Sequence, residues 1–165
     1  MKISSETRSV LKNFATINSG IKVESGNQLK TISQMKNILA VATVPESFNQ
    51  EFSIYNLTEF LGATSLLDNP DFDFNDQSVS ISDNSSAMTY FYASEGMVTS
   101  PEKMITMPDA EIKVDISSSL LSELQKAASV LGVNDLVLES DGTTIKLIVT
   151  DKKNATSNVF SRIVG

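Results

Sequence analysis

The sequence predicts an α+β protein made of tandem copies of one unit, in which a short strand leads into a capped helix and then into antiparallel strands. Two observations support this prediction. The copies start near Met1, Phe52 and Ile112, a spacing of about 50–60 residues that falls within the range of repeated architectures. After each helical segment, polar and apolar residues alternate, as they do in half-buried antiparallel strands.

The first copy contains a helix near residues 5–17, which Ser4 or Ser5 can cap. Apolar residues recur on one face of this helix at helical spacing, and they are Val10, Leu11, Phe14 and Ala15. Arg8 and Lys12 are four residues apart and therefore project together from another face. The stretches GIKVE, QLKTIS and ILAVATV follow as strands.

The second copy begins with the strand FSIY, and Asn56 caps a helix near residues 57–67. The expected buried positions are Leu57, Phe60, Leu61, Thr64 and Leu67. This helix carries Glu59 and no cation, so it differs in charge from the first helix. DFDF and SVSIS follow as strands of a half-buried sheet.

The third copy is predicted to start with a strand over Ile112–Ile116, followed by a helix that Ser117 caps and Gly132 ends. Its expected buried stripe consists of Leu120, Leu121, Leu124, Ala127, Ala128 and Leu131. Lys126 lies off that stripe. Asp141-Gly142 between DLVLES and TIKLIVT is typical of a hairpin turn.

These copies predict a complete first domain at 1–93, a linker at 94–110 and an incomplete second domain at 111–165. The linker contains Gly96, Pro101 and Pro108, which favour an irregular crossing segment. It is also partly apolar, so it either packs back onto a domain or borders a binding groove. The chain stops within the apparent strand VFSRIV, and about 50–60 further residues would complete a fourth copy.

The composition excludes several classes of chemistry. The chain has no His and no Cys, so it offers no thiolate, no Cys-rich zinc site and no imidazole base. An enzyme would need to use carboxylates or Lys, and Asp71 and Asp73 in DFDF are the one candidate metal pair. Their alternation on a strand is also typical of a solvent-facing side, which we favour over a metal site, so we expect no metal, no cofactor and no catalytic residue. The longest apolar run, ILAVATV, is too short to span a membrane.

Charge is distributed unevenly along the chain. The formal net charge is −7, which disfavours nucleic-acid adhesion over the whole surface. Cations nevertheless dominate residues 1–36, whereas no Lys or Arg occurs from Asn37 to Glu102. This asymmetry indicates either that one positive surface lies on an acidic body or that the charges only keep the protein soluble.

Three stretches resemble the sliding clamp of T-even-type bacteriophages, a DNA polymerase processivity factor. They are SVLKNFATINSGI, FSIYNLTEFLGATSLL and EIKVDISSSLLSELQK. The resemblance implies a clamp fold with helices on one face of the sheets and a C-terminally truncated second domain. It also implies a homotrimeric ring that encircles double-stranded DNA, binds the replicative polymerase and the clamp loader, and works in the cytoplasm of the infected bacterial host.

By the same resemblance, the residues that line the DNA are Arg8, Lys12 and Lys126, and Lys2, Lys22 and Lys30 are further candidates. Such cations would contact phosphates, which carry no sequence information. A polymerase peptide would dock beside the linker, where the candidate contacts are Met104, Ile105 and Met107. The alternative to a clamp is a non-enzymatic phage structural protein or protein-binding module without a DNA role.

Overall fold

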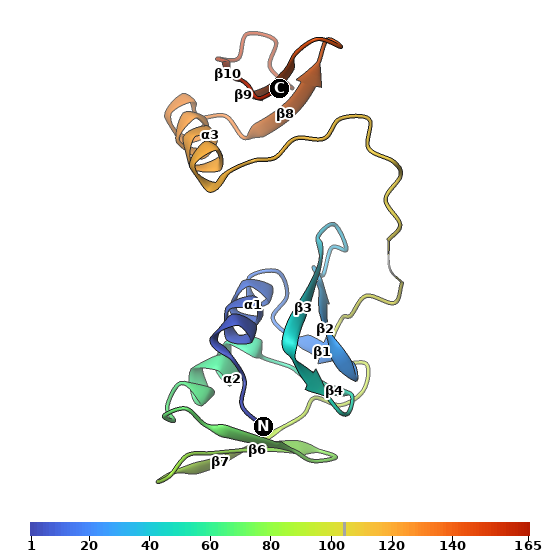
Figure 1. The fold of residues 1–165 in the computed structure, drawn as a ribbon, viewed down its shortest axis with the longest axis vertical. Coiled ribbons are helices and arrows are strands. Elements are labelled where there is room, and N and C mark those ends of the chain that lie inside the picture. The colour runs from blue at the N-terminus through green and yellow to red at the C-terminus, as the bar shows by residue number, and fades with distance from the viewer. Residues whose placement is uncertain (104) are drawn as a thin grey trace. The chain divides into compact units, whose positions relative to one another are not determined.

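A computed structural model describes residues 1–103 and 105–165 of the chain. The chain divides into two compact units, Met1–Ile105 and Thr106–Gly165. Figure 1 shows the helices and strands of each unit. Met104, one of the candidate polymerase contacts, lies outside the described residues.

The first helix, α1 (Ser5–Ala15), begins where the sequence predicts. Ser4 is its N-cap, and the Ser4 Oγ accepts a hydrogen bond of 3.1 Å from the Thr7 backbone N–H, which satisfies one of the donors that a helix start leaves free. Leu11 and Phe14 are buried as the hydrophobic periodicity indicates. Thr7 is also fully buried, although its polarity gave no sign of this.

Four antiparallel strands form the first sheet. They are β1 (Ile21–Val23), β2 (Gly26–Ile32), β3 (Leu39–Phe48) and β4 (Phe52–Ile54), in the spatial order β3-β2-β1-β4. The strand β4 starts the second copy of the repeated unit, yet it pairs with β1 of the first copy. The two copies are therefore joined through this sheet.

The second copy continues with α2 (Leu57–Thr64), β5 (Asp71–Phe74), β6 (Ser78–Ser82) and β7 (Ala87–Phe91). The three strands form an antiparallel sheet in the order β5-β6-β7. A second connection joins the copies from the other direction, because Met1 of the first copy hydrogen-bonds to β5 of the second. The Met1 amino group donates to the Phe72 carbonyl at 2.6 Å, and the Phe72 N–H donates to the Met1 carbonyl at 2.7 Å.

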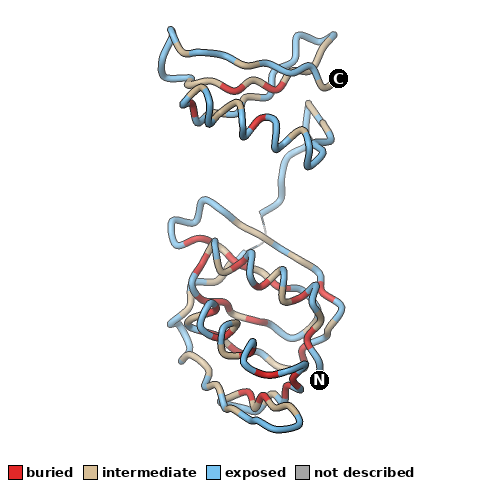
Figure 2. Tube along the Cα trace, turned by 90° about the vertical axis from the view of Figure 1, so that its left-hand side faces the viewer, coloured by how far each residue is buried: buried red, intermediate tan, exposed pale blue. Residues whose placement is uncertain are grey.

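The helices α1 and α2 pack against each other, and Figure 1 shows them side by side next to the strands of the first unit. The core lies between these helices and the inner faces of both sheets. In Figure 2 the buried positions recur along the helices and alternate along the strands. The alternation arises because successive strand residues point to opposite faces. The side chains at 1% exposure or less in this core are Leu29, Ile54, Leu57, Val79 and Ile81.

The second unit contains α3 (Ser118–Leu131) and the antiparallel strands β8 (Asp135–Ser140), β9 (Ile145–Thr150) and β10 (Phe160–Ile163). The strand order is β10-β9-β8. Ser117 caps α3, and Gly132 ends it in the left-handed conformation, with φ 66°. The buried core is small and consists of Leu124, Val133, Leu147 and Val149.

Two expectations for the third copy are wrong. Residues 112–116 form no strand in the described structure, because an isolated extended segment needs a neighbouring strand to bond to, as β4 has in β1. Leu121, expected in the buried stripe of α3, is 43% exposed. Leu136 and Leu138 lie opposite the buried Val149 and Leu147, yet are 49% and 38% exposed. In the described part of this unit, no second helix covers these side chains.

Candidate nucleic-acid interface

The outward side of α1 carries the two cations that the sequence places together. Arg8 and Lys12 are four residues apart within the helix, so they lie one turn apart on the same side. Lys12 is exposed and Arg8 is half-buried. Among the described residues, no carboxylate forms an ion pair with either side chain. The buried Arg8 Nε also lacks a hydrogen-bond partner there. Neither charge is therefore neutralised by a carboxylate within the described part of the chain.

The opposite side of α1 fixes the helix to the core. Leu11 and Phe14 are 5% and 3% exposed. At the start of the helix, Glu46 of β3 accepts hydrogen bonds from the Ser4 N–H and the Thr7 hydroxyl. Burial raises the pKa of Glu46, but these hydrogen bonds outweigh it and the net pKa is lowered. The ionised carboxylate therefore ties the helix to the sheet, which holds Arg8 and Lys12 in place.

The neighbouring helix α2 presents a different surface. Asn56 caps it by accepting a hydrogen bond of 3.0 Å from the Glu59 N–H. The Tyr90 hydroxyl of β7 donates to a Glu59 carboxylate oxygen at 3.3 Å. Burial, followed by the Glu59 charge, raises the pKa of Tyr90. Since α2 has Glu59 in its first turn and no Lys or Arg, positive charge in this helix pair comes from α1 alone.

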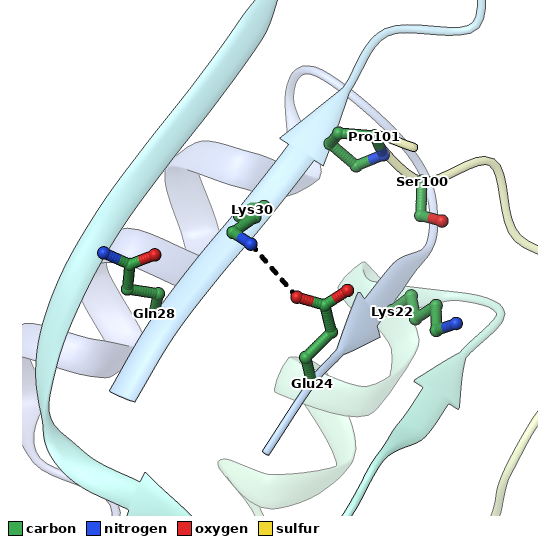
Figure 3. Close-up of a pocket in the computed structure, with 6 residues that line it drawn as sticks. All are labelled: Lys22, Glu24, Gln28, Lys30, Ser100 and Pro101. Atoms are coloured by element: carbon green, nitrogen blue, oxygen red, sulfur yellow. Dashed lines mark hydrogen bonds and ion pairs between the residues drawn. The ribbon is translucent and has the colours of Figure 1, made fainter. Parts of the chain in front are cut away.

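Lys22 and Lys30 lie on the first sheet rather than on the helices. Lys22 alternates with the buried Ile21 and Val23 in β1, so it points away from the core. Figure 3 shows Lys22 and Lys30 beside Glu24 and Pro101, with helices behind the strands. These two lysines therefore do not share a surface with Arg8 and Lys12.

Each of the three additional lysines has an acidic partner. Lys22 Nζ lies 2.8 Å from Glu51, Lys30 Nζ lies 3.0 Å from Glu24, and Lys2 Nζ lies 3.1 Å from Asp71. The hydrogen bond to Glu51 raises the pKa of Lys22 against the opposing effect of burial. Asp71, half of the alternative metal pair, is thus engaged by Lys2. Among the described residues, no cluster of three or more acidic side chains could hold a metal ion.

Lys126, the third predicted DNA-lining residue, is exposed on α3 of the second unit. It takes part in none of the ion pairs found among the described residues. On the same helix, Glu123 pairs with Arg162 of β10 at 3.9 Å.

The candidate polymerase contacts that the structure describes are exposed. Ile105, at the end of the first unit, is 60% exposed, and Met107, in the second unit, is 78% exposed. Farther back in the linker, Met97 is 59% exposed. No described helix is long and apolar enough to cross a membrane.

Sequence reasoning missed the turn that follows α1. Asn18 is 6% exposed, and its amide group hydrogen-bonds to two distant carbonyls. Gly20 lies so near the β4 backbone that a Cβ atom there would be 2.9 Å from the Ile54 carbonyl oxygen. The signal was present, because Asn18 and Gly20 belong to LKNFATINSGI, a phrase that helical or strand periodicity does not explain.

Two solved structures share this architecture at low sequence identity. The PCNA2-PCNA3 complex from Sulfolobus tokodaii matches with a TM-score of 0.53 and 11% identity, over 93% of this chain and 68% of that one. The H. pylori beta clamp in complex with diflunisal matches with a TM-score of 0.59 and 16% identity, over 99% of this chain and 54% of that one. The fold is therefore the α+β clamp fold, as the sequence predicts.

Sequence relatives narrow this class to a family. Residues 4–98 match the family model described as DNA polymerase processivity factor. The sliding clamp of Vibrio phage KVP40 is 33% identical over the whole of this chain and 77% of that protein. The sliding clamps of Enterobacteria phage T4 and Escherichia phage RB69 are 32% and 28% identical, over 84% and 88% of this chain.

The chain belongs to the DNA polymerase processivity factor family, and it is a processivity factor rather than an enzyme. This confirms the resemblance to phage sliding clamps. The chain spans 61% and 65% of the length of the T4 and RB69 proteins, which is less than two thirds of each.

Proposed function

We propose that this protein acts as a DNA sliding clamp, which encircles duplex DNA and tethers the replicative polymerase for processive synthesis. It binds DNA through phosphate contacts and reads no base sequence. The ring is a homotrimer, a clamp loader places it on DNA, and it works in the cytoplasm of the infected bacterial host. Membership of the processivity factor family supports this proposal.

The observation that carries the DNA-binding part is the pair of cations on α1. Arg8 and Lys12 stand one turn apart, and among the described residues neither forms an ion pair. A surface cation without a carboxylate partner can neutralise a phosphate without first breaking an ion pair. Lys126 of α3, in the second unit, is likewise in no ion pair found among the described residues, and we propose that it also contacts phosphate.

Phosphate contacts suit a protein that must move along DNA. Backbone contacts position a protein on the duplex but carry no sequence information, so the binding energy varies little from one base pair to the next. Lys12 and Lys126 bear their charge on long flexible side chains, which can follow the phosphates as the DNA moves. The net charge of −7 disfavours DNA on the remaining surface.

The test is the salt dependence of DNA retention by wild type and the double variant Arg8→Ala, Lys12→Ala. We expect weaker retention and a flatter plot of log K against log salt, by about 0.9 for each phosphate that the variant no longer neutralises. Lys22→Gln with Lys30→Gln is the matched control, because it removes the same charge from the other face of the first sheet. An unchanged slope in the Arg8, Lys12 variant would leave the protein without a DNA interface on α1 and would favour the protein-binding alternative.

Polymerase tethering is proposed to use the linker, where Ile105 and Met107 expose apolar side chains. An apolar surface with polar surroundings favours protein docking. The measurement is a titration with the C-terminal peptide of the cognate polymerase, with Met104→Ser and Ile105→Ser combined in one variant. Affinity equal to wild type in a folded variant would show that these side chains do not receive the polymerase.

A further inference from the structure

The turn after α1 joins three segments that are distant in the sequence. The Asn18 Nδ2 group donates one hydrogen bond of 3.0 Å to the Ile32 carbonyl at the end of β2, and another of 2.9 Å to the Thr99 carbonyl in the linker. The neighbouring Ser19 carbonyl accepts a hydrogen bond of 2.7 Å from the Leu57 N–H at the start of α2. The turn thus connects β2, α2 and the linker.

Asn18 uses its whole side-chain amide in this turn. It is 6% exposed, and a buried amide is costly unless its donors and acceptor are paired. Both N–H groups reach carbonyls, and the Asn18 Oδ1 accepts a weaker hydrogen bond of 3.4 Å from the Gly20 N–H. The donors of one planar amide thereby hold Thr99 at a fixed place relative to β2.

Gly20 allows the turn to lie close to β4 and to the linker, as the attachment of the linker to the first unit through Asn18 requires. A Cβ atom at this position would lie 2.9 Å from the Ile54 carbonyl oxygen and 3.1 Å from the Val98 Cγ1 atom. Both distances are shorter than normal van der Waals contact, so a larger residue would require the β4 backbone to shift and Val98 to move. The linker is therefore held by packing at Val98 and by a hydrogen bond at Thr99.

The attachment separates two parts of the linker. Before it, the Ala93 N–H donates a hydrogen bond of 2.8 Å to the Ser53 carbonyl of β4, so the stretch 93–99 is fixed at both ends. After it, residues 100–103 and 105–116 make no hydrogen bond among those found for the described chain. The fixed stretch borders a cavity of about 690 Å³ whose lining also includes residues of β1 and β4. The residues that matter here are Lys22, Phe52, Glu95, Val98 and Thr99.

We propose that Asn18 is a positioning residue, which fastens residues 94–99 of the linker to the first unit and so fixes one wall of this cavity. Asn18 itself does not line the cavity. The fastening of the linker does not depend on the proposed function. Its consequence does rest on the proposed function, because it is that a polymerase peptide meets a linker surface that is already ordered. Preformed surfaces bind more tightly because less ordering entropy is lost on binding.

Site-directed spin labelling tests the attachment without DNA or polymerase. The chain has no cysteine, so Met97→Cys gives one label site within the fixed stretch, and Met107→Cys gives another beyond it. With the label at position 97, we expect a slow-motion spectrum when position 18 is the native Asn. We expect a narrowed, fast-motion spectrum in the Asn18→Ala and Asn18→Asp variants. Ser19→Ala, next to Asn18 and exposed, is the control and should leave the spectrum unchanged. The label at position 107 should be equally mobile in all variants.

A label at position 97 that stays slow in a folded Asn18→Ala protein, as judged by circular dichroism, would overturn the proposal. If that variant does not fold, Asn18→Asp decides, since it keeps the size and the Oδ1 acceptor of Asn18 and removes only the two donors to Ile32 and Thr99. A label that stays slow in a folded Asn18→Asp protein would equally overturn the proposal.

Peptide titration then tests the consequence. We expect Asn18→Ala to bind the C-terminal polymerase peptide more weakly than wild type, and Ser19→Ala to match wild type. If wild type does not bind the peptide, the proposed polymerase site fails while the attachment stands on the spin-label result. If wild type and Asn18→Ala bind equally although the label is released, the positioning role is overturned.

Discussion

Ile21 of β1 lies directly opposite Ile54 of β4, and both side chains are buried, at 2% and 1% exposure. The two residues belong to different copies of the repeated unit. Their pairing thus holds one copy to the other within the shared buried core of the first unit. Helix α1, which carries Arg8 and Lys12, depends on that core for its orientation.

Replacement of Ile54 with Ala is expected to destabilise the first unit by about 2–5 kcal/mol, because it removes buried methyl groups and leaves a cavity. Denaturant unfolding followed by circular dichroism measures this change. Tyr55→Ala is the matched control, since Tyr55 is the next residue and is 61% exposed. Equal losses in the two variants would mean that the β1–β4 contact does not join the copies.

Two glycine substitutions should have opposite effects. Gly20→Ala is expected to destabilise the first unit, because its Cβ would lie 2.9 Å from the Ile54 carbonyl oxygen. Gly62→Ala in α2 meets no atom within 4 Å and should stabilise the unit by about 0.5–1 kcal/mol through helix propensity. The melting temperatures of the two variants check this. A stabilising Gly20→Ala would contradict the close packing around the turn.

Replacement of Glu46 with Gln should change how stability depends on pH. The folded-state pKa of Glu46 lies below its ordinary value of 4.5, so its ionised form stabilises the fold above pH 4.5. That contribution is lost as the pH falls through the folded pKa. Wild type should therefore exceed Glu46→Gln in stability at neutral pH, and the difference should shrink below pH 4.5. Urea unfolding at several pH values measures it, with Ser47→Ala as control, and a difference that grows in acid would refute the assignment.

The paired lysines of the first sheet should contribute little to stability. Lys22 and Lys30 form ion pairs whose carboxylates are about half exposed, and such surface pairs are worth about 0–1 kcal/mol. The double variant Lys22→Gln, Lys30→Gln is expected to lose no more than roughly 1 kcal/mol of unfolding free energy for each ion pair removed. Unfolding experiments in low and high salt check this, because screening should narrow the difference from wild type. A larger loss that salt does not reduce would mean that these pairs are not ordinary surface pairs.

The sequence predicted the order of elements because local chemistry determines it. Ser4, Asn56 and Ser117 cap helices where their side chains can accept a backbone hydrogen bond. Apolar spacing predicted the buried Leu11 and Phe14. Each of these features is decided within a few residues of the chain, so periodicity and capping patterns are sufficient to find it.

The sequence by itself also placed Arg8 and Lys12 together, since both lie on one helix. Only the tertiary structure decided that Lys22 and Lys30 lie on a different surface from Arg8 and Lys12 and form ion pairs with acidic side chains. That outcome depends on which face of the sheet the helices cover and on which acids neighbouring strands bring near. Neither can be read from spacing along the chain.

The same distinction explains the errors in the third copy and the turn that was missed. Leu121 and residues 112–116 have the local pattern of a buried helix face and a strand, but burial and strand pairing both require a second element nearby. Asn18 has no local pattern at all, because its partners at Ile32 and Thr99 come from distant parts of the chain. The sequence determined what each segment can form, whereas the tertiary structure decided which segments meet, because contact energies depend on distance in space rather than along the chain.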